Sequence, residues 1–286
     1  MNDALLPFLI ENRGVRGFAV RLGGSLDAMF GWRHYPVDVR HLLSEALAAT
    51  PLLAADLPVG ARFNLQFQGQ GALKLLVTQI NSELELRGMT KFAENATGDF
   101  HALMSGGVLA CMLESKGAAD NYQATVEVVG ESLAESLQVY FQRSEQLSTL
   151  IRLAVGADSL AGLMLQRLPE KCTDDDWHHV YTLFQTLGET ELRDTDAATL
   201  LNRLFFEDRV RVFEPRPIRM QCRCSHAQIS GMLLALGETE VESVLQEQGK
   251  VEVTCEFCGR SYPFSPLEVK ALFAAAQVHH PSGVAH

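Results

Sequence analysis

"QCRCSHAQ" (residues 221–228) and "VTCEFCGR" (253–260) contain four of the six cysteines in this chain of 286 residues. The first stretch holds a C-x-C pair and the second a C-x-x-C pair, and 30 residues separate Cys224 from Cys255. Two close pairs with an insert between them suit a tetrahedral zinc ion, which needs four thiolates that converge on one point. We predict one Zn²⁺ site with four ligands: Cys222, Cys224, Cys255 and Cys258.

A thiol-disulfide oxidoreductase is a competing interpretation of the C-x-x-C pair. In thioredoxin-like sites this motif begins a helix, whereas "GRSYPF" (259–264) after Cys258 is typical of a turn and an extended run. Four unrelated buried thiols are disfavoured, because close pairs are rare by chance. His226 is an alternative ligand, but a surface or capping role is favoured because four thiols are available.

The two pairs belong to a predicted C-terminal domain, residues 215–275. "EPRPIR" (214–219) marks its beginning, and helix-like stretches at 225–237 and 238–249 fill the interval between the pairs. A domain this small buries little apolar surface. Structural zinc contributes on the order of 10–16 kcal/mol, comparable to the roughly 5–15 kcal/mol that stabilises a whole domain. Metal removal should therefore unfold this domain, and residues 276–286 are expected to be a flexible tail.

Residues 1–172 have the pattern of an α+β domain. "RFNLQFQGQGALKLLVTQI" (62–80) alternates apolar and polar residues before Gly69-Gln70-Gly71 and resumes apolar residues after it. This pattern predicts a β-hairpin with one buried face. Further strands are expected at 14–22, 84–92, 107–114, 122–129, 149–155 and 162–168.

Two helices are predicted within this N-terminal domain. Residues 35–50 place apolar side chains at helical spacing, and Pro51 is expected to end or kink that helix. Residues 130–146 begin with a capping box, in which Ser132 is followed three residues later by Glu135.

Residues 173–214 are predicted to be an acidic helical linker. Helices are expected over 173–188 and 196–208, and the interval 171–214 holds five Lys/Arg against ten Asp/Glu. Neither helix is long enough to be stable without packing on a neighbour. The first helix carries an apolar stripe: Trp177, Val180, Tyr181, Phe184 and Leu187.

The composition points to a cytosolic protein that binds neither membranes nor nucleic acids in general. The formal net charge is −11, while a general nucleic-acid binder needs a basic face. No apolar run reaches the 18 or more residues that a membrane helix needs, and the N-terminus does not resemble a secretory signal. In the reducing cytosol, six cysteines are not expected to be standing disulfides. Cys111 is expected to be a buried thiol, with an accessible Cys172 the less favoured alternative.

The complete pattern resembles the heat shock protein thirty-three family of redox-regulated holdase chaperones. The resemblance rests on "VRVFEPRPIRMQCRC" (210–224), "TCEFCGRSYPF" (254–264), "LQFQGQGALKLLV" (65–77) and "GESLAESLQVYFQRSEQ" (130–146), in the expected order. It spans nearly the whole chain and is far more specific than the cysteines alone.

The resemblance implies an α+β N-terminal domain, a helical linker and a C-terminal zinc domain, in a protein without enzymatic activity. Such a protein is inactive while it is reduced and zinc-bound. Oxidation is implied to form the disulfides Cys222–Cys224 and Cys255–Cys258, to release zinc, and to unfold the zinc domain and the linker. The oxidised protein is then expected to form a homodimer and to bind unfolding client proteins without ATP. The stripe from Trp177 to Leu187 is the expected linker or client-binding face.

A zinc-ribbon protein that binds RNA is the remaining alternative. It would need permanent zinc and a basic surface. Residues 215–286 hold six Lys/Arg against seven Asp/Glu, which argues against it.

Overall fold

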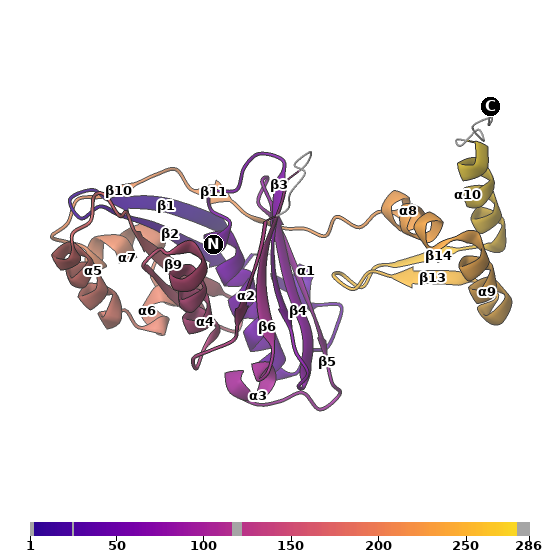
Figure 1. Ribbon diagram of the computed structural model, residues 1–286, viewed down its shortest axis with the longest axis horizontal. Coiled ribbons are helices and arrows are strands. Elements are labelled where there is room, and N and C mark those ends of the chain that lie inside the picture. Colours follow the sequence, from indigo (N-terminus) through magenta and orange to yellow (C-terminus); the bar gives the residue numbers. More distant parts are fainter. Residues whose placement is uncertain (1–2, 25, 116–121, 279–286) are drawn as a thin grey trace. The chain divides into compact units, whose positions relative to one another are not determined.

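The structure is a computed structural model that describes residues 3–24, 26–115 and 122–278. The chain separates into two compact units, residues 1–221 and 222–286 (Figure 1). Each unit has its own hydrophobic core, and the larger unit has two.

An antiparallel sheet forms one side of the larger unit. Its strand order is β10-β1-β2-β9-β8, and β11 also pairs with β1. Successive side chains along each strand point to opposite faces of the sheet. The strands are β1 (Ala4–Ile10), β2 (Val15–Leu22), β8 (Thr149–Val155), β9 (Leu160–Arg167), β10 (Val210–Val212) and β11 (Arg216–Pro217).

The second sheet contains the predicted hairpin. Phe63 lies opposite Ile80, and Phe67 opposite Leu76, which confirms the pairing expected across the glycine turn. The strand order is β12-β5-β4-β3-β6-β7, and all pairs are antiparallel except β12 with β5. The strands are β3 (Ala61–Gln68), β4 (Leu73–Asn81), β5 (Glu85–Phe92), β6 (Val108–Ser115), β7 (Tyr122–Glu127) and β12 (Arg219–Met220).

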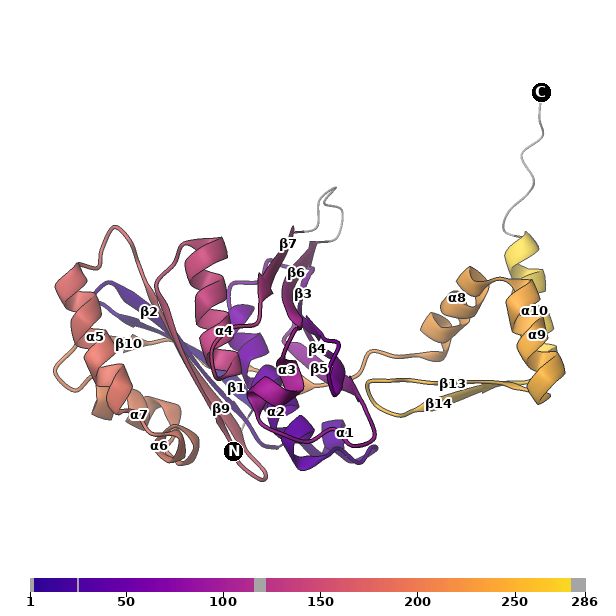
Figure 2. The same cartoon turned by 60° about the horizontal axis from the view of Figure 1, so that its bottom comes forward.

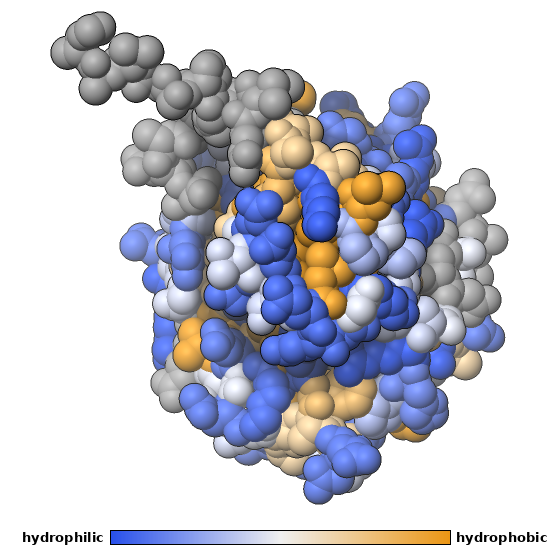
Figure 3. Space-filling view, turned by 90° about the vertical axis from the view of Figure 1, so that its right-hand side faces the viewer, coloured by the Kyte–Doolittle hydropathy of each residue, from blue (hydrophilic) through white to orange (hydrophobic). Residues whose placement is uncertain are grey.

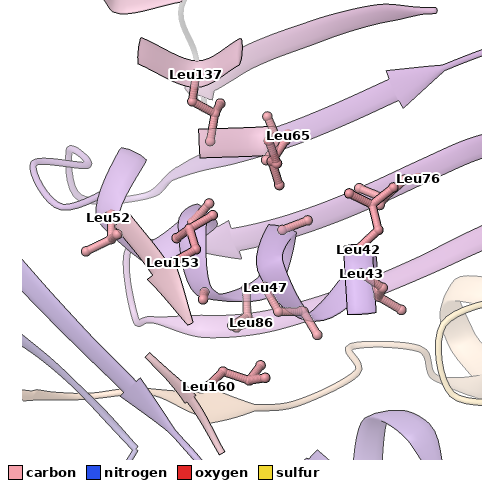
Figure 4. Packing of buried hydrophobic residues seen from close by; sticks show 14 of the residues in the cluster. Leu42, Leu43, Leu47, Leu52, Leu65, Leu76, Leu86, Leu137, Leu153 and Leu160 are labelled. Carbon is pink, nitrogen blue, oxygen red and sulfur yellow. The ribbon is translucent and has the colours of Figure 1, made fainter. Parts of the chain in front are cut away.

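Helix α2 (Val37–Leu53) is the central element of the larger core and contacts strands of both sheets. Leucines of α2 meet leucines of both sheets and of α4 in this core (Figure 4). The other helical segments of this region are short: α1 (Leu26–Phe30), α3 (Phe100–Met104), α4 (Leu133–Tyr140) and a π-helical turn, η1 (Phe141–Glu145).

Pro51 was expected to end or kink this helix; it does not end it, because α2 continues to Leu53. Proline has no N–H to donate to the carbonyl four residues earlier, yet the N–H of Ala54, three residues after Pro51, still donates to Thr50 O at 3.1 Å. Leu52 is 1 % exposed, so burial of the last turn favours continuation of the helix.

The capping box expected at the start of α4 is only half formed. The Ser132 hydroxyl accepts from the N–H of Glu135 at 3.2 Å, as predicted. The Glu135 carboxylate accepts from the N–H of Glu131 at 2.8 Å, one residue before the N-cap. Helix α4 also ends at Tyr140, earlier than expected, because the chain continues as the π-helical turn.

Three helices cover the face of the first sheet opposite to α2 (Figures 1 and 2). They are α5 (Asp174–Thr186), α6 (Glu189–Asp194) and α7 (Ala197–Leu204). Thr173 and Asp176 form a complete capping box at the start of α5. The interface is apolar on both sides; its fully buried members include Phe8, Ile10, Val15, Leu163, Leu165, Val180, Phe184, Leu200, Leu201 and Phe205.

The smaller unit is built from α8 (His226–Leu236), α9 (Glu238–Gln248), β13 (Val251–Thr254), β14 (Ser261–Phe264) and α10 (Pro266–Val278). Eight buried side chains form its core: Leu233, Val241, Val251, Cys255, Tyr262, Phe264, Val269 and Phe273. The face in Figure 3 is largely hydrophilic with smaller apolar areas. Within the expected tail, residues 276–278 belong to α10, and residues 279–286 lie outside the described part of the chain.

Truncation of Leu201 should loosen α5–α7 selectively. Leu201 is 0 % exposed between α7 and the first sheet. Leu201→Ala should therefore cost about 2–5 kcal/mol of local stability, as for other buried leucines. Hydrogen exchange should show faster exchange over residues 174–204, with unchanged protection in β3 and β4. Tyr181→Ala is the control, because Tyr181 is 44 % exposed and its loss should leave exchange near wild type.

Candidate metal centre

The four predicted cysteines converge on one point in the smaller unit. Cys222 and Cys224 lie in the segment before α8, and Cys255 and Cys258 lie in the turn between β13 and β14. Their sulfur atoms all lie within 4.8 Å of one another. The Cys222–Cys255 and Cys224–Cys258 sulfur distances are 3.6 and 3.3 Å. In a tetrahedral site with Zn–S bonds of about 2.3 Å, sulfurs lie about 3.8 Å apart. The cysteines are free thiols, and their arrangement fits a four-thiolate metal site.

The turn between β13 and β14 orients its two sulfurs with backbone groups. The Sγ of Cys255 accepts from the N–H groups of Phe257 and Cys258, and the Sγ of Cys258 accepts from the N–H of Arg260. The chain closes through Cys255 N–H to Arg260 O at 2.9 Å and Gly259 N–H to Cys255 O at 2.8 Å. Gly259 has φ +68°, a conformation that favours glycine. Backbone donors of this kind stabilise thiolates, which are the form that binds metal.

The electrostatics of the cluster favour a bound cation. Burial and the neighbouring thiols raise the pKa of Cys258, and burial, together with Cys222, raises the pKa of Cys255. Burial also acts to raise the pKa of Cys224, but hydrogen bonds from Tyr262 and the other thiols outweigh it and bring that pKa to about 7. Without a metal, the cluster therefore holds only part of the charge that four thiolates would carry. A divalent cation removes this restriction, because it stabilises all four thiolates together.

Tyr262 is a member of the site that our sequence analysis missed. Its hydroxyl donates to the Sγ of Cys224 at 3.2 Å, and its side chain is buried. The Arg260 guanidinium interacts with the same hydroxyl and with the negative charge on Cys224, which raises the pKa of Arg260. The alternation of β14, in which Tyr262 and Phe264 are buried and Ser261 and Pro263 exposed, is the signal that could have placed Tyr262 inside.

His226 lies outside the sulfur cluster. It is the first residue of α8, is exposed, and its ring lies 4.5 Å from that of Phe264. Its Nδ1 lies 3.3 Å from the Ser230 hydroxyl. The only group of His, Cys, Asp and Glu side chains placed for metal binding among the described residues consists of the four cysteines.

The other cysteines and histidines are separate from this site. Cys111 and Cys172 are 2 % and 4 % exposed, which confirms the buried thiol and argues against an accessible Cys172. Burial raises the pKa of Cys111 to about 12 and is the main cause that raises the pKa of Cys172. His179 is half-buried, and its Nε2 lies 3.0 Å from an Asp208 carboxylate oxygen. His279 and His280 lie outside the described residues.

The predicted linker stripe is mostly covered. Val180, Phe184 and Leu187 are buried against the first sheet, and Trp177 is partly buried beside them. Tyr181 is 44 % exposed and is not part of this contact.

The fold and the site together define a mixed helix-and-sheet protein with a separate unit that can hold a metal ion through four cysteines. The chain belongs to the Hsp33 family, whose model, described as "Hsp33 protein", matches residues 3–265. This match confirms the resemblance that the sequence motifs indicated.

Curated relatives align along nearly all of the chain. A 33 kDa chaperonin of Methylobacillus flagellatus is 37% identical, and the alignment covers 100% of this chain and 99% of that protein. A 33 kDa chaperonin of Nitrosococcus oceani is 39% identical over 95% of this chain and 94% of its own length. The crystal structure of the 33 kDa chaperonin of Thermotoga maritima has a TM-score of 0.84 at 23% identity, and covers 98% of this chain and 100% of its own. This structural match supports the fold.

Zinc affinity should fall steeply with decreasing pH. The raised pKa values of Cys255 and Cys258 mean that the metal-free site binds protons there at pH 7, and zinc must displace them. Release of at least two protons predicts a loss of about 100-fold in apparent affinity per pH unit below neutrality. Competition with a chromogenic chelator at pH 6.5 and 7.5 measures this change. An affinity that is independent of pH would contradict a thiolate site, and Cys111→Ser should behave as wild type.

Removal of the Tyr262 hydroxyl should weaken zinc binding without removing a ligand. Tyr262→Phe leaves the Cys224 thiolate without its donor, and loss of such a partner lowers metal affinity about 10- to 100-fold. Chelator competition measures the affinity, and Tyr181→Phe is the matched control at an exposed site in the other unit. Wild-type affinity in Tyr262→Phe would show that this hydrogen bond does not stabilise the centre.

Proposed function

We propose that this protein is an oxidation-activated holdase chaperone that works without ATP and is inactive while reduced and zinc-bound. The observation that carries the proposal is the convergence of four free thiols within 4.8 Å in a separate unit of an Hsp33-family chain. The names of the curated relatives support a chaperone role and a protein that is not an enzyme.

No helix in the described part of the chain is long and apolar enough to cross a membrane. We propose a cytoplasmic location.

Three functional parts follow from this proposal. Residues 1–172 would be the N-terminal α+β domain, residues 173–214 the helical linker, and residues 215–275 the zinc and redox-switch domain. Residues 216–220 pair with β1 and β5, so the compact metal-binding unit itself begins at Cys222. The linker depends on its contact with the first sheet, because its helices are short.

Zinc would be held by Cys222, Cys224, Cys255 and Cys258 in the resting protein. When bound, the metal would keep the four sulfurs as thiolates and stabilise the smaller unit. In the described part of this unit only eight buried side chains form the core, so it would depend on the metal more than the larger unit does.

Oxidation would convert these ligands into two disulfides. Each disulfide forms when two thiols lose two protons and two electrons to one molecule of peroxide, which becomes two molecules of water. We propose the pairs Cys222–Cys224 and Cys255–Cys258. All four sulfurs lie within 4.8 Å, so these pairs are within reach, although the shortest distances, 3.6 and 3.3 Å, join sulfurs of different motifs. Local disulfides leave the two motifs unlinked, whereas the crossed pairs would constrain the unfolded unit.

Unfolding of the smaller unit would then release the linker. The chain between α7 and Cys222 is held by β10, β11 and β12, which are only two or three residues long. Such short strands add little stability of their own. Release would expose the buried side chains of Val180, Phe184 and Leu187, together with the sheet face beneath them. We propose that this apolar surface binds unfolding client proteins and that the oxidised protein forms a homodimer. Nucleic acid is not a proposed partner.

Zinc release and client protection should occur together when the reduced protein is oxidised. We would treat it with peroxide under mild heating, follow free zinc with a chromogenic chelator, and measure light scattering of a thermally unfolding client. Release of zinc followed by suppressed aggregation, both reversed by a thiol reductant, is the expected result. Retained zinc without suppression would make the metal a structural element only. Disulfide exchange catalysed by the reduced, metal-free protein would favour an oxidoreductase.

Cys255→Ser should partly activate the protein without oxidant. Loss of one thiolate weakens zinc binding, and partial unfolding of the smaller unit should raise client protection in the reduced protein. The matched control is Cys111→Ser, in the core of the larger unit. Wild-type zinc affinity in Cys255→Ser would refute the four-cysteine assignment.

A further inference from the structure

The sheet face under the linker combines apolar side chains with arginines. Strands β1, β2, β8 and β9 contain four arginines and no Asp or Glu. Strand alternation places Arg21, Arg152 and Arg167 on the same face as the apolar residues that contact α5–α7. Arg16 lies on the opposite face, where it pairs with Asp56 at 2.7 Å.

Each of the three arginines on this face holds the chain that covers it. Arg21 donates to the carbonyl of Leu192 at 2.7 Å. Arg167 donates to the carbonyl of Cys172 at 2.8 Å and forms an ion pair with Asp174 at 2.8 Å.

Arg152 combines polar and aromatic contacts. Its guanidinium donates to the carbonyl of Leu187 and lies 5.2 Å from the centre of the Phe184 ring. Phe184 and Leu187 are both buried members of the apolar interface. One arginine therefore contacts the backbone end of α5 and an apolar anchor of the same helix.

Arg13 lies in the turn between β1 and β2 and also pairs with the covering segment, at the end of these two strands. It pairs with Asp176 at 3.0 Å and with Asp208 at 2.7 Å, and the Asp208 side chain is 0 % exposed. The covering segment is thus an apolar stripe flanked by acids, and residues 171–214 carry ten Asp/Glu against five Lys/Arg. The linker is therefore an example of what this face binds: apolar side chains with carboxylates beside them.

Departure of the linker would leave the arginines without their acidic and carbonyl partners beside an apolar surface. Backbone carbonyls of a replacement segment could satisfy Arg21 and Arg152, as those of Leu192 and Leu187 do here. A segment without carboxylates would leave Arg13 and Arg167 without the charged partners that they have in the linker, which is unfavourable. A segment with carboxylates at its ends would satisfy them with charge-assisted hydrogen bonds. We infer that the exposed face selects unfolded client segments in which apolar residues are flanked by Asp or Glu. This inference rests on the proposed function, in which the linker leaves this face.

Two labelled peptides with one apolar core test this inference on the oxidised, full-length protein. One peptide is flanked by Asp and Glu, and the other by Lys and Arg. Fluorescence anisotropy at low salt should give at least about fivefold tighter binding of the acidic peptide, and the ratio should approach one in 0.5 M salt because salt screens the charges. Equal affinities, or tighter binding of the basic peptide, would overturn the inference.

Arginine variants test whether these side chains cause the preference for the acidic peptide. In the double variant Arg13→Gln/Arg167→Gln, which removes the guanidinium groups that pair with linker carboxylates, the affinity ratio should fall below about two. In the matched control Arg16→Gln, on the opposite face, the ratio should stay at the wild-type value. An unchanged ratio in the double variant would place the preference elsewhere and overturn the assignment.

A linker variant separates this inference from the redox proposal. Phe184→Ser/Leu201→Ser removes two buried apolar contacts of the linker without placing a carboxylate beside Arg152, and leaves the sheet and the cysteines unchanged. Under reducing conditions it should prefer the acidic peptide by the same ratio, with zinc still bound. If peroxide fails to activate the wild type while this variant still discriminates, the redox proposal fails and the inference stands. If activation succeeds without discrimination in either protein, the inference fails alone.

Discussion

Four thiols that meet within 4.8 Å impose the constraint on which the smaller unit depends. Their charges repel, so full ionisation requires a cation, and their convergence holds together two segments separated by 30 residues. The core around them is small. Any reaction that consumes the thiolates therefore removes both the metal ligands and the main link between the two segments. The function that we propose therefore couples the chemistry of these four sulfurs to the folding of the smaller unit.

The first sheet of the larger unit has two faces with different partners. One face packs on α2 within the leucine-rich core, and the other packs on the short helices α5–α7. Helix α2 is enclosed by both sheets, whereas the linker helices contact the sheet on one side only. Arginine contacts to backbone carbonyls and carboxylates supplement the apolar contact on that second face. In the function that we propose, the same sheet serves as a permanent wall of the core and as a surface whose cover can leave.

Local patterns predicted those parts of the molecule that local chemistry determines. Alternation predicted the hairpin at 62–80, and thiol spacing predicted which four cysteines converge. Of the two effects expected of Pro51, an end or a kink, the end of α2 does not occur there, and the burial of Leu52 that favours continuation depends on distant strands. Tyr262 was missed because its contact with Cys224 joins residues that lie 38 positions apart. The packing of the linker on the first sheet was equally inaccessible, since its arginine partners come from distant strands.

The short strands β10 and β11 also close one edge of the first sheet. They supply hydrogen-bond partners to the outer side of β1, whose inner side pairs with β2. An uncovered edge strand presents a row of free N–H and C=O groups that can template pairing with another chain. If the segment from α7 to Cys222 leaves with the linker, β1 becomes such an edge. A backbone that adds to β1 would then be recognised by its extended conformation, independently of its side chains.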